Sequence, residues 1–335
     1  MPIRLSLIFV LLLALVLPVH AGELKIASVA PEGSKWMQEM RKAAEVVKTR
    51  TEGRVVLKFY GGGVMGSDKK VLRKIRVGQL DGSTFTPSGL AEVYPDLNVY
   101  GLPLLFQSLD EVDRVRAAED ANMRAGLEAA GFVSFGFAEG GFAKLMSNVP
   151  VRGIDDLKGR KVWVPDGDRI SYAAMQALGL APVTLPLTDV LTGLQTGLLD
   201  IVATSAVGAL VLQWHTKVKY VTDLPLAYIV ATLAIAKPSF DKLSAPDQAV
   251  VREVMEGAYE RLNHDNRIEN EKAEAALISS GIQSVKPDSE QVREWRRIVM
   301  EANHKEGQEG AFDPAVLAKI ETQLQSLRAS AADAS

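Results

Sequence analysis

Apolar and polar positions follow two different periods along the chain, and the changes between them predict most of its elements. Short apolar or alternating runs predict strands, and runs with apolar residues three or four apart predict helices. The strand-like runs cover residues 24–30, 55–60, 132–138, 161–164, 200–204 and 229–236. The helical runs cover residues 34–51, 68–77, 109–130, 168–178, 188–195 and 206–215. This alternation indicates an α/β architecture with parallel sheets covered by helices on both faces.

One helical run is much longer than the others. Ser244 is a candidate N-cap, Pro246 suits the first turn, and Asp247 completes a pattern like a capping box. From there to about residue 280, only Gly257 interrupts the helix-forming residues. At a rise of about 1.5 Å per residue, such a helix is on the order of 50 Å long and exceeds the width of one small lobe. The pattern therefore predicts two lobes bridged by one long helix.

The first 21 residues have the pattern of a removed secretory signal. Arg4 precedes an apolar run over residues 5–17, and Val19 and Ala21 place small side chains where a signal peptidase reads them. The run is too short for a membrane span, and no later stretch approaches about 18 consecutive apolar residues. We therefore expect cleavage near Ala21 and an exported, periplasmic protein without a direct membrane anchor.

Composition limits the compartments and the kinds of partner that are possible for this chain. The sequence contains no cysteine, so neither a lipid-attachment thiol nor a disulfide framework is available. A chain of 335 residues is long for one hydrophobic core, which again favours two lobes. Its formal net charge is −3, with both signs interspersed. Nucleic acid or an anionic membrane calls for a basic stripe, so we expect neither as a partner.

A glycine-rich segment, Gly61-Gly62-Gly63-Val64-Met65-Gly66, matches the spacing of a dinucleotide-binding fingerprint, and Asp81 lies twenty residues after Gly61. Lys58 interrupts the preceding strand, whereas the first strand of such a site is normally apolar throughout. Export also separates the protein from the nicotinamide pool. We interpret the segment as a strand-to-helix turn whose glycines adopt positive φ, and we expect no cofactor. A secreted NAD-dependent oxidoreductase stays open as an alternative.

Catalytic and metal-binding patterns are weak. The three histidines after the signal, His215, His264 and His304, are far apart, and no metalloprotease, serine-hydrolase or regularly spaced acidic motif is present. The pairs Asp155-Asp156 and Asp166/Asp168 have carboxylates for acid–base chemistry. At turns and helix starts such residues more often act as caps, as we expect of Asp168. We therefore predict neither an enzyme nor a metal site.

Polar and aromatic residues at the predicted strand ends are the better candidates for binding, because ligands of α/β sheets lie at the carboxyl ends of strands. Trp163 ends a strand directly before the turn 165–168 and offers a flat apolar wall with one hydrogen-bond donor. Small hydroxyl residues follow two other strands. The candidates from this pattern are Trp163, Thr86, Ser88, Thr204 and Ser205, with Trp36 and Trp214 as further aromatic residues.

Several segments, in this order and spacing, resemble the substrate-binding proteins of TRAP transporters, the DctP-like family. They are residues 51–55 (TEGRV), 102–106 (LPLLF), 156–162 (DLKGRKV) and 194–200 (LQTGLLD), together with Tyr220 and residues 241–244 (DKLS). The resemblance covers essentially the whole chain after the signal. It implies a two-lobed clamshell that closes on a solute by a hinge motion and delivers it to membrane permease subunits. It also implies crossing strands between the lobes and a long helix through both.

Under this resemblance we expect residues 22–140 with 229–268 to form lobe I and residues 141–228 with 269–328 to form lobe II. Residues 329–335 are expected to be a frayed tail. The function implied is the periplasmic solute-binding component of a TRAP transporter, for an organic acid or an aromatic, weakly polar compound. A clamshell subunit that senses a ligand for a signalling kinase is an alternative in another class.

The sequence departs from the family pattern at three places in the expected pocket. Trp163 stands where most relatives have an arginine, Ala143 follows Gly141-Phe142 where a second arginine is common, and Ala203-Thr204 replaces a Glu-Asn pair. We therefore expect an uncharged, aromatic or weakly polar solute held by Trp163 and the hydroxyls of Thr86 and Thr204. The alternative is a carboxylate contact restored by a basic residue. The basic candidates are Lys144, Arg169 and Arg160.

Overall fold

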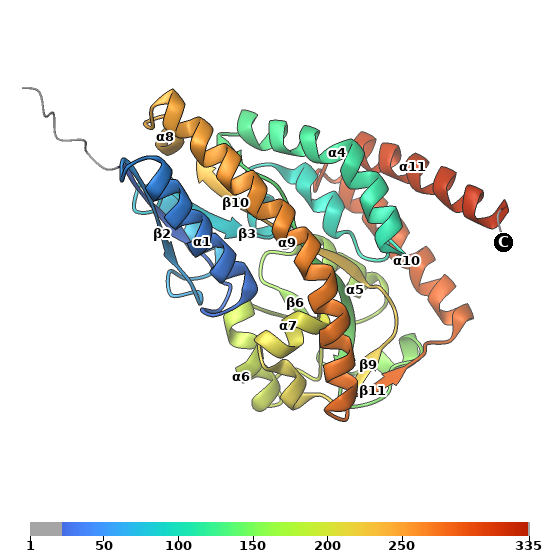
Figure 1. The fold of residues 1–335 in the computed structure, drawn as a ribbon. Helices are drawn as coiled ribbons and strands as arrows, with labels where there is room; N and C mark the ends of the chain where they lie inside the picture. The colour runs from blue at the N-terminus through green and yellow to red at the C-terminus, as the bar shows by residue number, and fades with distance from the viewer. Residues whose placement is uncertain (1–21, 334–335) are drawn as a thin grey trace, which may run out of the picture.

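Two ten-residue strands, β5 (Ala138–Ser147) and β10 (Ala227–Ala236), run through both lobes of the structure. The structure, a computed structural model, describes residues 22–333. The predicted signal, residues 1–21, lies outside the described residues. The two lobes lie one above the other in Figure 1, with β10 and α9 passing from one to the other.

The pairing of the two long strands explains how they join the lobes. The first half of β10 pairs antiparallel with β5, and its second half pairs antiparallel with β3 (Gly82–Phe85) and β4 (Phe132–Ser134). The second half of β5 pairs antiparallel with β8 (Ile201–Thr204) and β9 (Tyr220–Thr222). One continuous sheet, ordered β11-β9-β5-β10-β3-β1-β2, therefore extends through the whole molecule.

The first lobe holds three neighbouring parallel strands. β1 pairs parallel with β2 and β3, and Ile26 and Leu57 of this sheet are buried against α1 and α9. The N-cap side chain of α1 is Ser34, as the sequence predicts, since its hydroxyl accepts from the amide of Met37. The other elements here are β1 (Gly22–Ala27), β2 (Val55–Tyr60), α1 (Lys35–Arg50), α2 (Asp68–Arg76), α3 (Pro87–Leu90), α4 (Leu109–Ala129) and α8 (Lys237–Phe240).

The second lobe is built of shorter pieces around two apolar clusters. One cluster packs α5 and α10 on β8, and the other packs α6 and α7 around Trp214. Its strands and helices are β6 (Trp163–Pro165), β7 (Val183–Leu185), β11 (Gln283–Val285), α5 (Arg169–Ala177), α6 (Val190–Gln195), α7 (Ala206–Val211) and α10 (Ser289–Gln308). Four 3-10 helices complete the structure, at Pro95–Gly101, Ile154–Leu157, Leu187–Asp189 and Trp214–Lys217.

The long helix is confirmed. α9 (Ala245–Ser279) has 35 residues, and the Ser244 hydroxyl caps it by accepting from the amide of Asp247. Its first half buries Val251 and Met255 in the first-lobe core, and its second half buries Leu277 in the second-lobe core. Figure 1 shows it running from α8 to the region of β9 and β11. One rigid element thus contacts both lobes.

Several predicted elements differ from the structure. The large sheet is mixed and not parallel, because β5 and β10 cross between lobes against the direction of their neighbours. The predicted strand 132–138 stops at Ser134, and the second crossing strand, β5, was not predicted. The predicted helix 206–215 ends as α7 at Val211. α11 (Pro314–Asp333) is helical through most of the expected frayed tail, residues 329–335.

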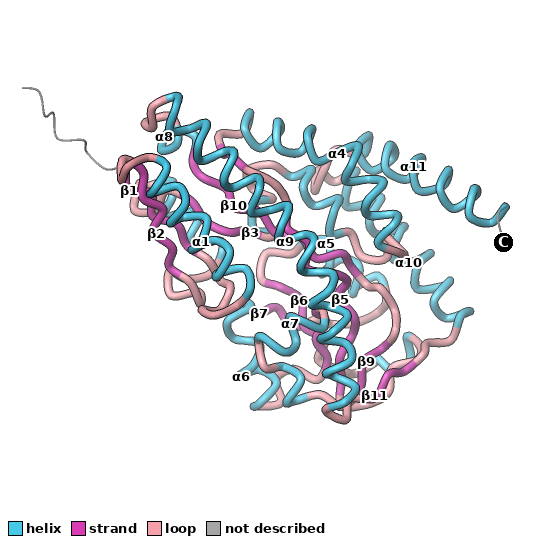
Figure 2. Tube along the Cα trace, in the orientation of Figure 1, coloured by secondary structure: helices cyan, strands magenta, loops and turns pink. Residues whose placement is uncertain are grey.

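α11 also differs from the predicted division into lobes, which assigned residues 269–328 to lobe II. Its side chains Leu317, Ile320 and Leu324 are buried in the same cluster as Val112 and Val115 of the first-lobe helix α4. α10, by contrast, packs on α5 of the second lobe. The last two helices therefore pass back from the second lobe to the first. Figure 2 shows α11 beside α4 in this arrangement.

The crossing strands are irregular where the lobes meet. Ile229 of β10 lies opposite Gly141 of β5, but the next residue, Val230, lies opposite Glu139, so Gly140 is an extra residue without a partner. Gly141 has φ +79°, a conformation that favours glycine. A bulge of this kind bends a strand and ends its regular pairing. It lies between the parts of β5 that belong to the two lobes.

Candidate functional site

A cavity of about 400 Å³ lies between the two lobes. This volume falls in the range of roughly 300–1,000 Å³ typical of small-molecule sites. The first lobe lines it with residues after β3, the second lobe with residues of the β6–α5 and β8–α7 connections, and the crossing strands with Leu145, Tyr228 and Ile229. The carboxyl ends of β3, β6 and β8 thus meet here, where an α/β protein is expected to bind a ligand.

Two tryptophans form one side of the cavity. Trp163 of β6 and Trp214 pack edge to face, with ring centroids 5.2 Å apart and an interplanar angle of 83°. The indole Nε1 of Trp163 donates to the carbonyl oxygen of Leu185 at 3.0 Å. That bond links β6 to β7 and uses the only donor of the ring. Trp163 therefore presents an apolar wall to the cavity but not the free hydrogen-bond donor that the sequence predicted.

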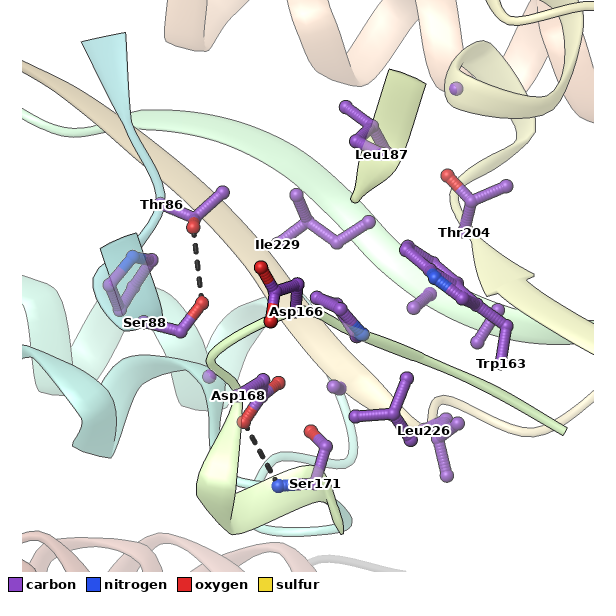
Figure 3. A pocket seen from close by; sticks show the side chains of 18 of the residues that line it. Thr86, Ser88, Trp163, Asp166, Asp168, Ser171, Leu187, Thr204, Leu226 and Ile229 are labelled. Atoms are coloured by element: carbon purple, nitrogen blue, oxygen red, sulfur yellow. Dashed lines mark hydrogen bonds between the residues drawn. The ribbon is translucent and has the colours of Figure 1, made fainter. Parts of the chain in front are cut away.

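Hydroxyl groups line the cavity from both lobes. Thr86 is the N-cap of α3, where its Oγ1 accepts from the amide of Gly89, and it bonds to the Ser88 hydroxyl at 3.2 Å. Ser205 caps α7 in the same way, accepting from the amide of Gly208 at 3.2 Å. Figure 3 shows Thr86 and Ser88 on one side of the cavity and Thr204 with Trp163 toward the other. The two pairs therefore line the cavity from different lobes.

The structure brings together six of the nine predicted binding residues and leaves three elsewhere. The six that line the cavity are Trp163, Thr86, Ser88, Thr204, Ser205 and Trp214. Trp36 packs edge to face on Tyr259 beside the first-lobe core and lies outside the cavity lining. Lys144 pairs with Asp223 and Glu274, both at 3.0 Å, and Arg169 pairs with Glu306 and Glu309.

The three basic candidates for a carboxylate contact lie outside the lining of the cavity. Lys144 and Arg169 are held by acidic partners away from the cavity, and Arg160 is exposed and lies outside the lining. Among the lining residues within the described range 22–333, Lys69 is the one basic side chain, and none is an arginine. The structure thus places none of the three basic candidates in the lining of the cavity.

Three carboxylates line the cavity instead, at Asp68, Asp166 and Asp168. Asp168 is the N-cap of α5, where it accepts from the amide of Ser171 at 3.0 Å, as the sequence predicts. Burial raises the pKa of its carboxyl, and its bonds at the start of α5 partly offset that rise. Asp166 is exposed to the cavity mouth. Asp68 was not among the predicted site residues.

Asp68 is the most unusual of the three. Its Oδ1 atom is shielded from solvent and has no hydrogen-bond partner. Burial raises the pKa of its carboxyl to about 6, and the neighbouring Thr86 hydroxyl lowers it in part. In the sequence, Asp68 is an acidic residue in the first turn of a predicted helix, which is a common position for an acid and does not indicate a binding site. Only the packing of α2 against α3 places it at a cavity.

The glycine-rich segment is a turn, as we interpreted it. Gly62, Gly63 and Gly66 have φ of +65°, +72° and +107°. The amides of Gly62 and Gly63 donate to the carbonyl oxygens of Ala30 and Ser28, at 2.8 and 3.0 Å. These amides tie the turn to the end of β1 and are therefore not free to hold a pyrophosphate.

Other chemistry is limited in the described part of the chain. Residues 22–333 contain no group of three histidine, aspartate or glutamate side chains placed to hold a metal ion. Over the same range, none of the helices combines the length and the apolar character of a membrane span. His215 bonds to the carbonyl oxygen of Ala209, and His304 bonds to Glu321 on the surface.

Beside the cavity, the crossing strands carry a network of buried charges, which we call the hinge network. Glu139 of β5, with 2% of its surface exposed, accepts from Arg267 of α9 at 2.8 and 2.9 Å and from the Tyr228 hydroxyl at 3.2 Å. Arg116 of α4 donates to the same hydroxyl at 3.0 Å and to Asp120 at 2.8 Å. Burial raises the pKa of Tyr228, which keeps its hydroxyl protonated. α4, α9 and both crossing strands are joined in this way.

Comparison with known proteins agrees with this arrangement. The family described as "Bacterial extracellular solute-binding protein, family 7" (DctP) matches residues 26–309. The C4-dicarboxylate-binding periplasmic protein DctP of Rhodobacter capsulatus is 27% identical over 258 residues, which cover 76% of this chain and 76% of that protein.

Two solved structures share the fold. A TRAP periplasmic solute-binding protein from Xanthobacter autotrophicus with bound β-D-galacturonate has a TM-score of 0.81 at 20% identity, covering 90% of this chain and 98% of the other. A TRAP protein from Haemophilus influenzae with bound L-gulonate has a TM-score of 0.82 at 17% identity, covering 90% and 99%. At these identities the likeness shows the two-lobed fold alone.

Proposed function

The chain belongs to family 7 of the bacterial extracellular solute-binding proteins, the solute-binding components of TRAP transporters, and from that membership we propose the details of how it works. It is a periplasmic receptor, cleaved near Ala21, that binds one small organic solute between its lobes. It delivers the solute unchanged to membrane permease subunits. The sensor and oxidoreductase alternatives have no support from the family match or from the glycine turn.

The observation that carries the proposal is the position of the cavity. Its lining comes from both lobes and from the crossing strands, so a solute in it contacts every part that a hinge motion would move. A ligand favours the closed state by the contacts it makes only there. The bulge at Gly140 and the adjacent Gly141 supply the irregular backbone at which such strands bend.

We further propose that the solute has an apolar body and is not a simple dicarboxylate. The three relatives named above are described with a C4-dicarboxylate, galacturonate and gulonate, all of which carry carboxylates. In this chain Trp163, Ala143 and Ala203 line the cavity at the places where the family pattern has polar clamps. An apolar wall stabilises an apolar solute by burial, at roughly 25 cal/mol per Å².

The test begins with the protein from residue 22, purified and then denatured to release any bound small molecule for identification by mass spectrometry. Scattering of the refolded protein with and without that molecule is then compared. We expect a smaller radius of gyration with the solute and no chemical change in it. A released solute that is turned over, or a radius that does not change on saturation, would contradict a clamshell receptor.

A further inference from the structure

Three carboxylates line the cavity: Asp166 and Asp168 lie on the side of Thr86 and Ser88 in Figure 3, and Asp68 packs on the helix that carries Ser88. Asp68 is the first residue of α2, and its carboxylate lies against Gly89 of α3 so closely that a Cβ on Gly89 would collide with it. α3 begins directly after Thr86 and contains Ser88. Figure 3 shows Asp166 and Asp168 on this same side, and Trp163 with Thr204 toward the other. The cavity therefore has an acidic end and an apolar end.

The acidic end is not neutralised by the protein. Among the ion pairs of the described residues, none includes Asp68, Asp166 or Asp168. Buried carboxylates elsewhere have a basic partner, as Asp247 has Arg54 at 3.0 Å and Glu119 has Lys319 at 2.7 Å. An ionised carboxylate that is buried without a partner is costly, so proteins rarely keep one without a reason. The missing partner at Asp68 points to a cation supplied from outside.

The groups of this chain do not supply that cation. The titratable side chains lining the cavity are Asp68, Lys69, Asp166, Asp168 and Tyr228. Lys69 is exposed and forms none of the ion pairs of the described residues. Asp168 is used as a helix cap, and Tyr228 bonds to Glu139 in the hinge network. Asp68 and Asp166 are left to meet a ligand.

We propose that the solute carries a positively charged amine, bound by Asp68 and Asp166 with the hydroxyls of Thr86 and Ser88, while its apolar body lies against Trp163. An ammonium group has three donors and suits two carboxylates with neighbouring hydroxyl oxygens. This inference rests on the proposed function, because it specifies the solute of the same cavity.

The experiment uses matched probes that differ in one group. For each of four bodies (phenyl, cyclohexyl, indole and butyl), the two-carbon amine, alcohol and carboxylate are added to the protein from residue 22 at pH 7, with calcium chloride as a separate arm. The midpoint of thermal unfolding is recorded, and any probe that raises it is titrated by calorimetry. We expect the amines to bind at least tenfold more tightly than the matched alcohols, and the carboxylates not to bind.

Variants locate the effect. Asp166→Asn should weaken the best amine about tenfold and leave its alcohol unchanged, because the exposed carboxylate contributes charge and not packing. Asp155→Asn is the matched control, since Asp155 is an exposed acid of the same lobe that lies outside the cavity lining. It should leave both affinities unchanged. Equal losses of amine affinity in the two variants would show an effect of the protein's net charge alone. They would overturn the assignment of the amine to this end of the cavity.

The outcomes separate the two proposals. Tighter binding of carboxylates or alcohols than of amines overturns the amine and leaves the receptor standing. If calcium chloride raises the unfolding midpoint and none of the amines does, the amine proposal is overturned and the acidic end binds a metal ion. If no probe raises the unfolding midpoint, and no small molecule is released from the purified protein, both proposals fail.

Discussion

The hinge network and the acidic end of the cavity both hold carboxylates shielded from solvent, but only those of the hinge network have charged partners. In the hinge network Glu139 has two bonds from Arg267 and one from Tyr228. At the cavity, Asp68 keeps an oxygen that has neither solvent nor a partner. Tyr228 joins the hinge network to the cavity, because it bonds to Glu139 and also lines the cavity.

The number of partners distinguishes a buried charge that stabilises the fold from one that is available to a ligand. A buried charge with a full set of partners holds elements together, here α4, α9 and the crossing strands. A buried charge without partners lowers stability in the free protein, which is tolerated where a ligand completes the site. Substitutions in the two regions should therefore change stability in opposite directions.

The largest expected effect is a loss of stability in the hinge network. Glu139→Ala removes the acceptor of Arg267 and Tyr228 and leaves both without it. Breaking a buried pair of this kind typically costs about 3–5 kcal/mol, and we expect about 3 kcal/mol because Arg267 is 35% exposed. Urea unfolding measures it.

Asp113→Asn is the control for that measurement. Asp113 binds the same Arg267, but 51% of its side chain is exposed. We expect a loss below about 1 kcal/mol, as is usual for exposed pairs. Equal losses in the two variants would mean that the burial of Glu139 is not what stabilises the crossing strands.

The second effect has the opposite sign. Burial raises the pKa of Asp68 to about 6, above its value of about 3.9 in an unfolded chain. The folded state therefore binds more protons between these values, and the stability of the free protein falls as pH rises from about 4 to about 6. Asp68→Asn removes this term and should stabilise the free protein at pH 7 by on the order of 2 kcal/mol.

The same variant should show little gain in stability at pH 3.5, where Asp68 is mostly protonated in both states. It should also lose most of the affinity for an amine. Urea unfolding at pH 3.5 and 7, together with calorimetry, tests both statements. If the variant is less stable than the wild type at pH 7, Asp68 stabilises the fold as Glu139 does, and the prediction is wrong.

The smallest effect concerns the apolar end. Trp163→Phe removes the donor to the Leu185 carbonyl oxygen but keeps an aromatic wall. We expect a loss of stability of about 1 kcal/mol, typical of one hydrogen bond, and an affinity for the best amine within about threefold of the wild type. A tenfold loss of affinity with unchanged stability would instead show that the indole nitrogen contacts the solute directly.

The fold was predictable where local patterns decide it. The cap at Ser244 and the helix-forming run after it predict α9 closely. β5 was missed because Glu139, Gly140 and Gly141 interrupt the apolar alternation, and those residues belong to the bulge and the hinge network. The mixed sheet was missed because the direction of a strand depends on its partners and leaves no period in the sequence.

The residues that line the cavity at strand ends could be predicted from the sequence, but the charged residues of the cavity could not. Trp163, Thr86 and Thr204 line the cavity because strand ends converge in this architecture. Lys144 and Arg169 were misplaced because the acids that hold them are distant in sequence. Asp68 was missed because its position in a first turn is ordinary, and its loss of partners arises only when α2 meets α3.

Proton release on binding tests the central claim most directly. The best amine of the panel is titrated by calorimetry at pH 6 in several buffers with different enthalpies of ionisation. If the unpaired carboxylate of Asp68 receives a cation, its pKa falls on binding and about half a proton is released per solute bound. Proton uptake, or a binding enthalpy that does not change with the buffer, would contradict the account.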